Sequence, residues 1–518
     1  MKSKYIIIAA CIVLAFGSCR RSWLDVNTNP NALPSSTPDF TFAAAANRIA
    51  ATLGANELGE YWSGHWTQSS TYIISNTIFA YQFNNTNFNY WDSYYDILED
   101  LQYSINGADA SGRPYFGATA RVLKAYVYQI IVDLYGNAPY KDALKGTTAL
   151  APKFDDQKAI YEDLIKVLDT AITVLAANPL STALVGSDFV FGTQPGTTLS
   201  AATAHTKWIQ FANSLKLRIL MRQSRMPGRD TYIISEINRA AATPQGFLPL
   251  GLDVTVQPGY TASSGKMNPF YENWGYNAAG GVQAIGRYPR PTVYLFNVLK
   301  ATNDTFRLKR LAYPKGGEQA SPYPAEIVSN YVPVPFGAAS GYLSQNTSYI
   351  GPSQLKKGEI ARPMVLMTNA EVQFLLAEAK QRYGAAVTLP QTAQTYYENG
   401  VKESFRITGT TATYGAAAAT TLLTSGIDLA DWAASPDKLK AIWMQKWIAL
   451  TNYSGLEAWS DYRRTNYPNT PASLSTSPTA PRPVRLYYPQ SELASNGANV
   501  TAQGTINVFT GSLFWDVD

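Results

Sequence analysis

Cys19 carries a reactive thiol and directly follows a short segment with the pattern of an export signal. Two lysines precede an apolar run at residues 5–16, and the small residues 17–18 provide a cleavage zone. The apolar run is shorter than the roughly 20 residues that a membrane-spanning helix needs. Cleavage before Cys19 would free its amine for acylation, beside a thiol that can carry diacylglycerol. We therefore predict a lipoprotein signal peptide over residues 1–18 and lipidation of Cys19; the alternative is an ordinary signal peptide with a cysteine there by chance.

Lipidation at this position would place the mature chain, residues 19–518, on a membrane surface. Each acyl methylene that enters a membrane contributes about 0.8 kcal/mol, so several chains on one cysteine make a stable anchor. Cys11 lies within the signal segment and is removed with it. We therefore expect a mature chain without an internal disulfide.

A run of alternating Asp and Asn at residues 25–31 resembles the start of a calcium-binding EF-hand loop. That loop needs Gly at its sixth position and Glu at its twelfth, where this chain has Pro30 and Ser36. Asp and Asn also stabilise tight turns by bonding to their own backbone. We therefore favour a turn that tethers the N-terminal segment over a metal site.

Other patterns that could support catalysis are incomplete. Residues 259–266 resemble a phosphate-binding loop, but five residues separate the glycines and Met267 replaces the required Ser or Thr. His65 and His205 each have no second histidine nearby to form a zinc pair, and the chain has no Gly-x-Ser-x-Gly elbow. Paired carboxylates of a glycosidase would be distant in sequence, so they stay open as an alternative. We expect a non-catalytic protein without a metal or a cofactor.

The composition favours recognition of a neutral ligand. The chain has 34 Tyr and 11 Trp but only 15% charged residues, and its formal charge of +5 falls when the signal segment leaves. No basic run of the kind that neutralises phosphates is present, so we expect no nucleic-acid partner. Flat rings beside amides and hydroxyls suit sugars or peptides, through stacking and hydrogen bonds.

Four aromatic residues are the candidates for ligand contact. Trp274 and Tyr276 lie in a stretch rich in Gly and Asn, and Trp66 and Tyr72 belong to an aromatic cluster nearer the N-terminus. Trp62 and Trp66 are four residues apart and would share one face of a helix. That face could equally belong to the core, so each ring is either a stacking surface or a buried residue.

Apolar residues recur at helical spacing in several segments of the chain, which predicts a mainly helical fold. These segments are residues 91–105, 123–134, 160–175, 208–219, 372–379 and 443–450. Thr368 and Glu371 form a capping box, while Gly136 and Gly384 stand where C-terminal caps would be. Small residues such as Gly400 permit close helix pairs, as in tetratricopeptide arrays. We predict a tetratricopeptide-like scaffold of helical pairs in a single domain, residues 19–518.

Three long stretches rich in Gly, Pro, Ser and Tyr separate the helical segments, at residues 178–206, 251–295 and 310–360. Structureless loops of this length are uncommon unless they are functional or disordered. The many rings in these stretches, Tyr288 among them, argue against disorder. We therefore predict irregular loops that bind a ligand on the helical scaffold.

Six blocks occur in a fixed order along the mature chain. They are residues 24–31 (LDVNTNPN), 135–140 (YGNAPY), 208–222, 369–379 (NAEVQFLLAEA), 457–465 (EAWSDYRRT) and 482–492. As an ordered set, they resemble the SusD/RagB family of surface lipoproteins, in particular the branch that has the LDVNTNPN element near its N-terminus. This family partners TonB-dependent transporters in outer membranes of the Bacteroidota type.

The resemblance implies a SusD-like fold that docks on a SusC-like TonB-dependent transporter, with irregular loops as the ligand site. It also implies a nutrient-uptake function at the cell surface. The protein would be a lipid-anchored, non-catalytic outer-membrane protein that binds a glycan or an oligopeptide and delivers it to the transporter. Two alternatives stay open, a surface-anchored glycan-degrading enzyme and a helical-repeat adaptor for assembly.

Several charged residues lie inside the blocks that resemble the family. They are Arg218, Glu371, Glu378, Asp461, Arg463 and Arg464. Arginine forms strong bidentate pairs with carboxylates and tolerates burial in such pairs. We therefore predict that these residues link helices to the C-terminal segment through buried pairs and do not contact the ligand.

Overall fold

The computed structural model describes residues 36–192, 200–315, 328–409, 412–476 and 481–517. Cys19 and the Asp/Asn run at residues 25–31 lie outside the described residues. The described chain from Pro38 onward forms the larger compact unit of the protein. Across the described ranges, every helix is too short or too polar to cross a membrane.

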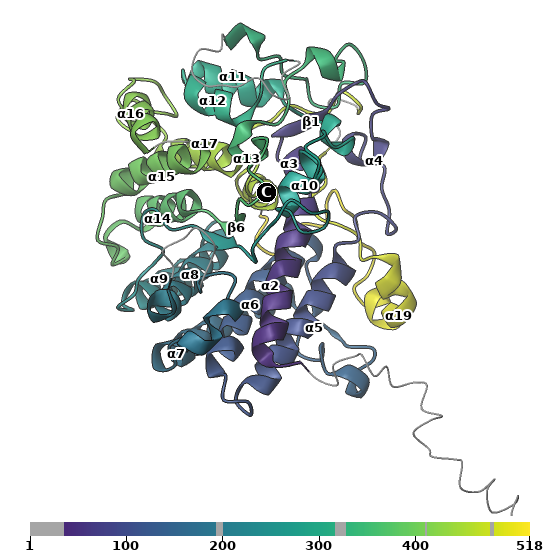
Figure 1. Ribbon diagram of the computed structural model, residues 1–518, viewed down its shortest axis with the longest axis vertical. Helices are drawn as coiled ribbons and strands as arrows, with labels where there is room; N and C mark the ends of the chain where they lie inside the picture. The colour runs from purple at the N-terminus through teal and green to yellow at the C-terminus, as the bar shows by residue number, and fades with distance from the viewer. Residues whose placement is uncertain (1–35, 193–199, 316–327, 410–411, 477–480, 518) are drawn as a thin grey trace, which may run out of the picture. The chain divides into compact units, whose positions relative to one another are not determined.

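The larger unit is built mainly from helices, which confirms the predicted fold class (Figure 1). Its longer helices are α2 (Pro38–Ala55), α5 (Trp91–Ala108), α6 (Pro114–Tyr135), α7 (Gln157–Ala177), α8 (Ala201–Arg222), α9 (Asp230–Ala241), α14 (Asn369–Tyr383), α15 (Ala393–Thr408), α16 (Ala412–Leu423), α17 (Lys438–Leu450), α18 (Gly455–Thr465) and α19 (Gln490–Thr501). Its shorter helices are α3 (Leu58–Trp62), α4 (Asn76–Phe79), α10 (Pro269–Trp274), α11 (Val293–Ala301), α12 (Thr305–Leu311) and α13 (Pro352–Leu355).

Helices that follow one another in the chain pack as neighbours. The series α5 to α9 forms one group and α14 to α17 forms another, and α14 packs on α8 to join the two groups (Figure 1). At the start of α14, the Thr368 hydroxyl accepts a hydrogen bond from the Glu371 backbone N–H (3.1 Å), as the capping box predicts. Gly136 ends α6 with a φ of 80°, a conformation that residues with a side chain rarely adopt.

Gly400 explains how closely α14 and α15 approach each other. A Cβ atom at this position would lie 2.8 Å from the ring of Phe374 on α14, which is closer than atoms in contact tolerate. The absence of a side chain at Gly400 thus lets the two helices pack closely, as predicted. Because the contact is steric, a larger residue here would push the helices apart.

Within the described residues the strands form three short antiparallel pairs, and two of these pairs join distant segments of the chain. The three pairs are β1 (Trp66–Gln68) with β5 (Pro289–Pro291), β2 (Ala138–Pro139) with β3 (Phe154–Asp155), and β4 (Val254–Val256) with β6 (Met364–Met367). In the first pair, Trp66 lies opposite Pro291 and Gln68 opposite Pro289. This pair brings the segment after β1 beside the segment before β5, although more than two hundred residues separate them in the sequence.

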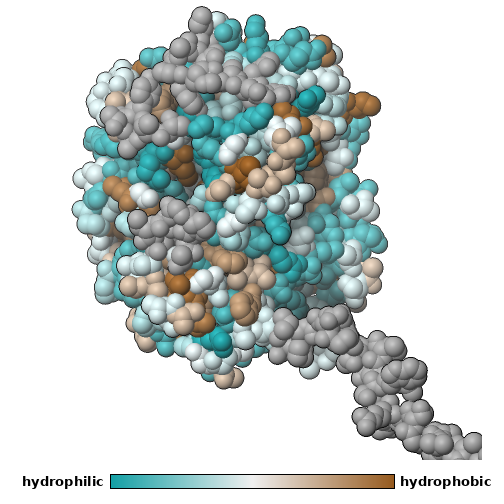
Figure 2. Space-filling model, in the orientation of Figure 1, coloured by the Kyte–Doolittle hydropathy of each residue, from teal (hydrophilic) through white to brown (hydrophobic). Residues whose placement is uncertain are grey.

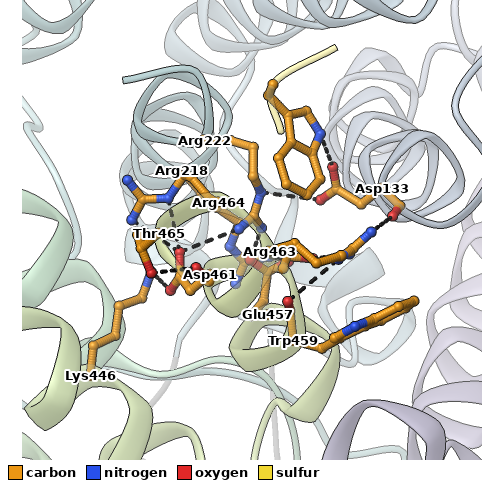
Figure 3. Close-up of polar contacts among 12 residues, drawn as sticks. Asp133, Arg218, Arg222, Lys446, Glu457, Trp459, Asp461, Arg463, Arg464 and Thr465 are labelled. Carbon is orange, nitrogen blue, oxygen red and sulfur yellow. Dashed lines mark hydrogen bonds and ion pairs between the residues drawn. The ribbon is translucent and has the colours of Figure 1, made fainter. Parts of the chain in front are cut away.

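A buried network of arginines and carboxylates ties α8, α14 and α18 together, and Figure 3 shows part of it. Arg218 of α8 forms a bidentate pair with Glu371 of α14, at 2.7 and 2.8 Å. Arg464 of α18 forms a second bidentate pair with Glu378 of α14, also at 2.7 and 2.8 Å. All four side chains are at most 2% exposed. The predicted structural role of these pairs is confirmed.

Two further cations extend this network toward α17. Arg222 pairs with Glu457, and the Lys446 Nζ lies 2.7 Å from the Asp461 carboxylate (Figure 3). Arg222 lies on α8 and Lys446 on α17, and both carboxylates lie on α18. The polar groups in this part of the interior thus have charged partners, which is the condition for burying them.

Arg463 differs from the predicted pattern. Its guanidinium donates hydrogen bonds to the backbone carbonyls of Asp133 (2.6 Å) and Val484 (2.8 Å) and to the Ser460 hydroxyl (2.7 Å). The prediction of a carboxylate partner was therefore wrong in detail for this residue. Arg463 still links helices to the C-terminal segment, but it does so through backbone groups.

Candidate functional site

The structure places Trp66 and Trp274 inside the protein and against each other. Trp66 is 0% exposed and Trp274 is 4% exposed, and their rings meet edge to face with centroids 5.6 Å apart. The Trp66 indole N–H donates to the Asn452 side-chain oxygen (2.8 Å), and the Trp274 indole N–H donates to the Gly54 carbonyl (2.9 Å). Both indoles have their polar group satisfied within the fold, as core residues do.

The expected helix face shared by Trp62 and Trp66 does not form. Helix α3 ends at Trp62, and Trp66 begins β1. Gly64 makes the turn between them with a φ of 85°, and a side chain there would meet Thr470 at 2.8 Å. The helical spacing was misleading because this glycine ends the helix between the two tryptophans.

Tyr276 also lies in the interior. It is 3% exposed and packs against the Tyr271 ring, with centroids 5.4 Å apart. The cavity beside Trp274 and Tyr276 has a volume of about 20 Å³, which is room for about one water molecule. Ligand contact by Trp66, Trp274 or Tyr276 stays a prediction, and it would require surrounding side chains to move.

Tyr72 is the predicted residue that the structure leaves at the surface. Its ring stacks on the ring of Tyr288 with centroids 3.9 Å apart and an angle of 11° between the planes. Both rings are half-buried, so each holds the other in place while part of it contacts solvent. A parallel pair of this kind offers a flat, preformed surface to a ligand.

Exposed apolar side chains lie near these two rings in the chain, or on the segment around Tyr342, which is hydrogen-bonded to Ser70. Ile73 is 95% exposed, Ile285 is 48% exposed and Leu343 is 42% exposed. The half-buried Tyr342 directly precedes Leu343. We refer to Tyr72, Ile73, Ile285, Tyr288, Tyr342 and Leu343 together as the tyrosine platform.

Backbone hydrogen bonds join the three segments that carry the tyrosine platform. The Ser69 N–H donates to the Tyr288 carbonyl (2.9 Å), and the Ser70 N–H donates to the Tyr342 carbonyl (2.9 Å). In return, the Tyr342 N–H donates to the Ser70 hydroxyl (2.8 Å). These contacts continue the pairing of β1 with β5, so the platform is attached to a rigid strand pair.

Side-chain hydrogen bonds also fix the turn that carries Ile73. The Gln68 side-chain amide donates to the Ile73 carbonyl (2.8 Å), and the Ser344 N–H donates to the Thr71 hydroxyl (2.7 Å). The Gln68 amide at the end of β1 and the hydroxyls of Ser70 and Thr71 after it therefore fix the backbone of the platform. The exposed parts of the rings and the aliphatic side chains are the groups that it offers to a ligand.

A serine, a histidine and a glutamate lie together near β1, but their geometry does not fit a catalytic triad. His65 Nδ1 lies 2.8 Å from Glu60 Oε2 and 3.0 Å from Ser63 Oγ, and its Nε2 lies 2.9 Å from the Trp447 carbonyl oxygen. A carbonyl can only accept, so Nε2 must carry a proton. The serine and the carboxylate share one ring nitrogen, and all three side chains are at most 3% exposed. This group therefore serves to pack the fold.

In the described ranges, no three His, Cys, Asp or Glu side chains gather closely enough to hold a metal ion. The face seen in Figure 2 has small groups of hydrophobic residues among hydrophilic ones. The tyrosine platform thus contains one ligand-contact residue predicted from the sequence, Tyr72, together with rings and aliphatic side chains that the structure brings beside it. Its chemistry is that of stacking and apolar contact.

The comparisons with known proteins agree with this fold. A SusD-like family model, described as "Starch-binding associating with outer membrane", matches residues 30–489. A solved SusD homologue from Bacteroides fragilis matches with a TM-score of 0.72 and 22% identity, over 93% of this chain and 99% of that one. A chitin-binding SusD homologue from Flavobacterium johnsoniae matches with a TM-score of 0.71 and 23% identity, over 93% and 99%. At these identities the structures show a common fold. No curated protein sequence matches.

Proposed function

The chain belongs to the SusD/RagB family, whose model spans most of its length, and from this we propose that it binds a neutral nutrient glycan at the tyrosine platform. In this proposal the protein is a non-catalytic, outer-membrane lipoprotein anchored through Cys19. It delivers its ligand to a SusC-like TonB-dependent transporter.

The observation that carries the proposal is the stacked, half-exposed pair of Tyr72 and Tyr288. An almost fully exposed isoleucine next to such a pair costs solubility, and grouped exposed apolar residues typically mark an interaction site. A sugar ring has a polar rim and an apolar C–H face, and that face stacks on an aromatic ring. The platform fits this face because its rings are held in place before a ligand arrives.

The choice of a glycan over an oligopeptide follows the family description, which names starch binding, and the relative described as chitin-binding. Both are neutral polysaccharides. The proposed absence of catalysis is consistent with the buried His65, whose two ring nitrogens already have partners.

The test is a binding panel of neutral oligosaccharides, including maltooligosaccharides and N-acetylated chitooligosaccharides, titrated into the mature protein by calorimetry. For a saccharide that binds, Tyr72→Ala and Tyr288→Ala should each weaken the affinity at least about tenfold, as expected for an aromatic anchor. Tyr72→Phe keeps the stacking face and should bind nearly as the wild type does. The melting temperatures should change little, because a stacked surface pair contributes about 0.5–1.5 kcal/mol.

Tyr103→Ala is the matched control, since Tyr103 is a 45% exposed ring on α5. Unchanged affinity in both platform variants would contradict the platform as the glycan site. Binding of oligopeptides instead of glycans, with the same dependence on Tyr72, would keep the site and correct the ligand class.

A further inference from the structure

A groove lies between the loop that follows α4 and the C-terminal segment that contains α19. Its volume is about 470 Å³, and its lining residues include Asn84, Asn85, Tyr487, Leu493, Thr501 and Ile506. Ligand sites typically measure about 300–1,000 Å³, so the groove is large enough for a saccharide unit or two. None of the lining residues belongs to the tyrosine platform, and α19 can be seen at the edge of the molecule in Figure 1.

The two walls of the groove are tied to each other. The Asn85 side-chain amide donates to Gln490 Oε1 (2.7 Å), and the Gln490 N–H donates to the Asn85 carbonyl (2.8 Å). At the next residue, the Ser491 hydroxyl donates to the Asp92 carboxylate on α5 (2.7 Å). A ligand would therefore meet a preformed groove and would not have to order it.

A kink in α19 shapes the second wall. Asn496 has a non-helical backbone (φ −135°, ψ 29°), and its side-chain amide donates to the Pro152 carbonyl (2.8 Å). Leu493 and Val500, on either side of the kink, both line the groove. The kink is thus fixed by a hydrogen bond outside the groove and does not consume a polar group inside it.

Tyr487 supplies an aromatic wall whose orientation is restricted by packing. The ring is half-buried and meets the Phe83 ring at an angle of 62°, with centroids 5.6 Å apart. Phe83 in turn packs on Trp62, which is fully buried. This chain of rings connects Tyr487 to the core, so its orientation is set by packing.

The polar groups in the groove are neutral. Asn84 Oδ1 accepts hydrogen bonds from the Thr86 N–H (2.9 Å) and hydroxyl (2.7 Å), which leaves its amide N–H₂ as the group it can offer. Thr501 donates its own hydroxyl to the Gly497 carbonyl (2.8 Å), so its oxygen can still accept. Among the described lining residues none carries a charge, and Ile506 adds an apolar surface.

We propose that this groove is a second binding site, for a neutral saccharide unit. A fixed ring, an amide donor and a hydroxyl acceptor together match a sugar, which has an apolar face and a rim of hydroxyls. A charged ligand would find no counter-ion among the lining residues. This inference rests on the proposed function for the class of ligand, but its residues are independent of the tyrosine platform.

The experiment compares groove variants and platform variants against the same oligosaccharide panel, by calorimetry with ligand-observed NMR for weak binding. Tyr487→Ala removes the ring, and Thr505→Arg fills the groove from an exposed position without deleting a packed side chain. The second variant keeps the test valid if Tyr487→Ala folds poorly. For a short saccharide we expect two equivalents bound by the wild type, one by either groove variant, and one by Tyr72→Ala.

The outcomes separate the two sites. Loss of all binding in Tyr72→Ala, with no effect of either groove variant, overturns the second site and leaves the proposed function. Loss in the groove variants alone supports the groove and overturns the platform. Failure of every saccharide to bind the wild type overturns both. If the groove variants bind glycans normally but no longer co-purify with the transporter, the groove is a protein interface and the inference is wrong.

Discussion

The buried pair between Glu378 and Arg464 makes part of the acid stability of the fold depend on one carboxylate, that of Glu378. Burial by itself raises the pKa of Glu378, but the guanidiniums of Arg464 and Arg382 outweigh it and lower the pKa from 4.5 to about 2. The carboxylate accepts two hydrogen bonds from Arg464 and one from Arg382 (2.9 Å). Its charged form is thus strongly preferred in the folded protein.

The lowered pKa of Glu378 determines how the stability of the fold changes with pH. Because the folded pKa lies below the unfolded one, the stabilisation is present above about pH 4.5 and is lost as the pH falls toward 2. Lowering the pKa of Glu378 from 4.5 to about 2 corresponds to roughly 3 kcal/mol of unfolding free energy. Glu378 is 0% exposed, so solvent screens little of this energy.

We expect Glu378→Gln to lower the unfolding free energy at pH 7 by about 3–5 kcal/mol, since it leaves Arg464 buried without its main partner. Between pH 4.5 and 2 the variant should lose stability less steeply than the wild type, by about 1.4 kcal/mol per pH unit. Urea denaturation at a series of pH values measures both quantities.

Glu398→Gln is the control. Glu398 pairs with Lys402 on the surface of α15 (3.8 Å), and such pairs contribute at most about 1 kcal/mol. The reasoning about Glu378 would be refuted if Glu378→Gln cost less than about 1 kcal/mol and kept the pH dependence of the wild type.

Two more outcomes can be checked directly. Cys19→Ala should move the protein from the membrane fraction to the soluble fraction, because it removes the predicted site of lipid attachment; sedimentation with washed outer membranes that lack the transporter would contradict the anchor. Trp274→Ala should lower the unfolding free energy by about 3–5 kcal/mol in urea titrations, because the ring is buried and its N–H is bonded to Gly54. A Trp274→Ala protein of unchanged stability and tenfold weaker glycan binding would instead restore this residue as a ligand contact.

Local patterns in the sequence were sufficient to predict several of the helices and some of their ends. A capping box such as the one at Thr368 and a glycine such as Gly136 act through hydrogen bonds within four residues, so their effect is encoded where they stand. The charged residues of the ordered blocks, Arg218 and Glu371 among them, were likewise predicted to form buried arginine–carboxylate pairs, and the structure shows that these two are partners. The pairing follows because a charge in an otherwise apolar helix needs a partner.

The tertiary structure decided which aromatic rings are exposed. Trp66 is buried because Asn452, 386 positions away, accepts its N–H, and Tyr72 is held at the surface by Tyr288, which the strand pair brings beside it. The sequence does not distinguish the buried rings from the exposed ones, since an aromatic residue among polar neighbours suits a core or a binding surface equally well. Burial depends on contacts between segments that are distant in the chain, and these exist only after the helices have packed.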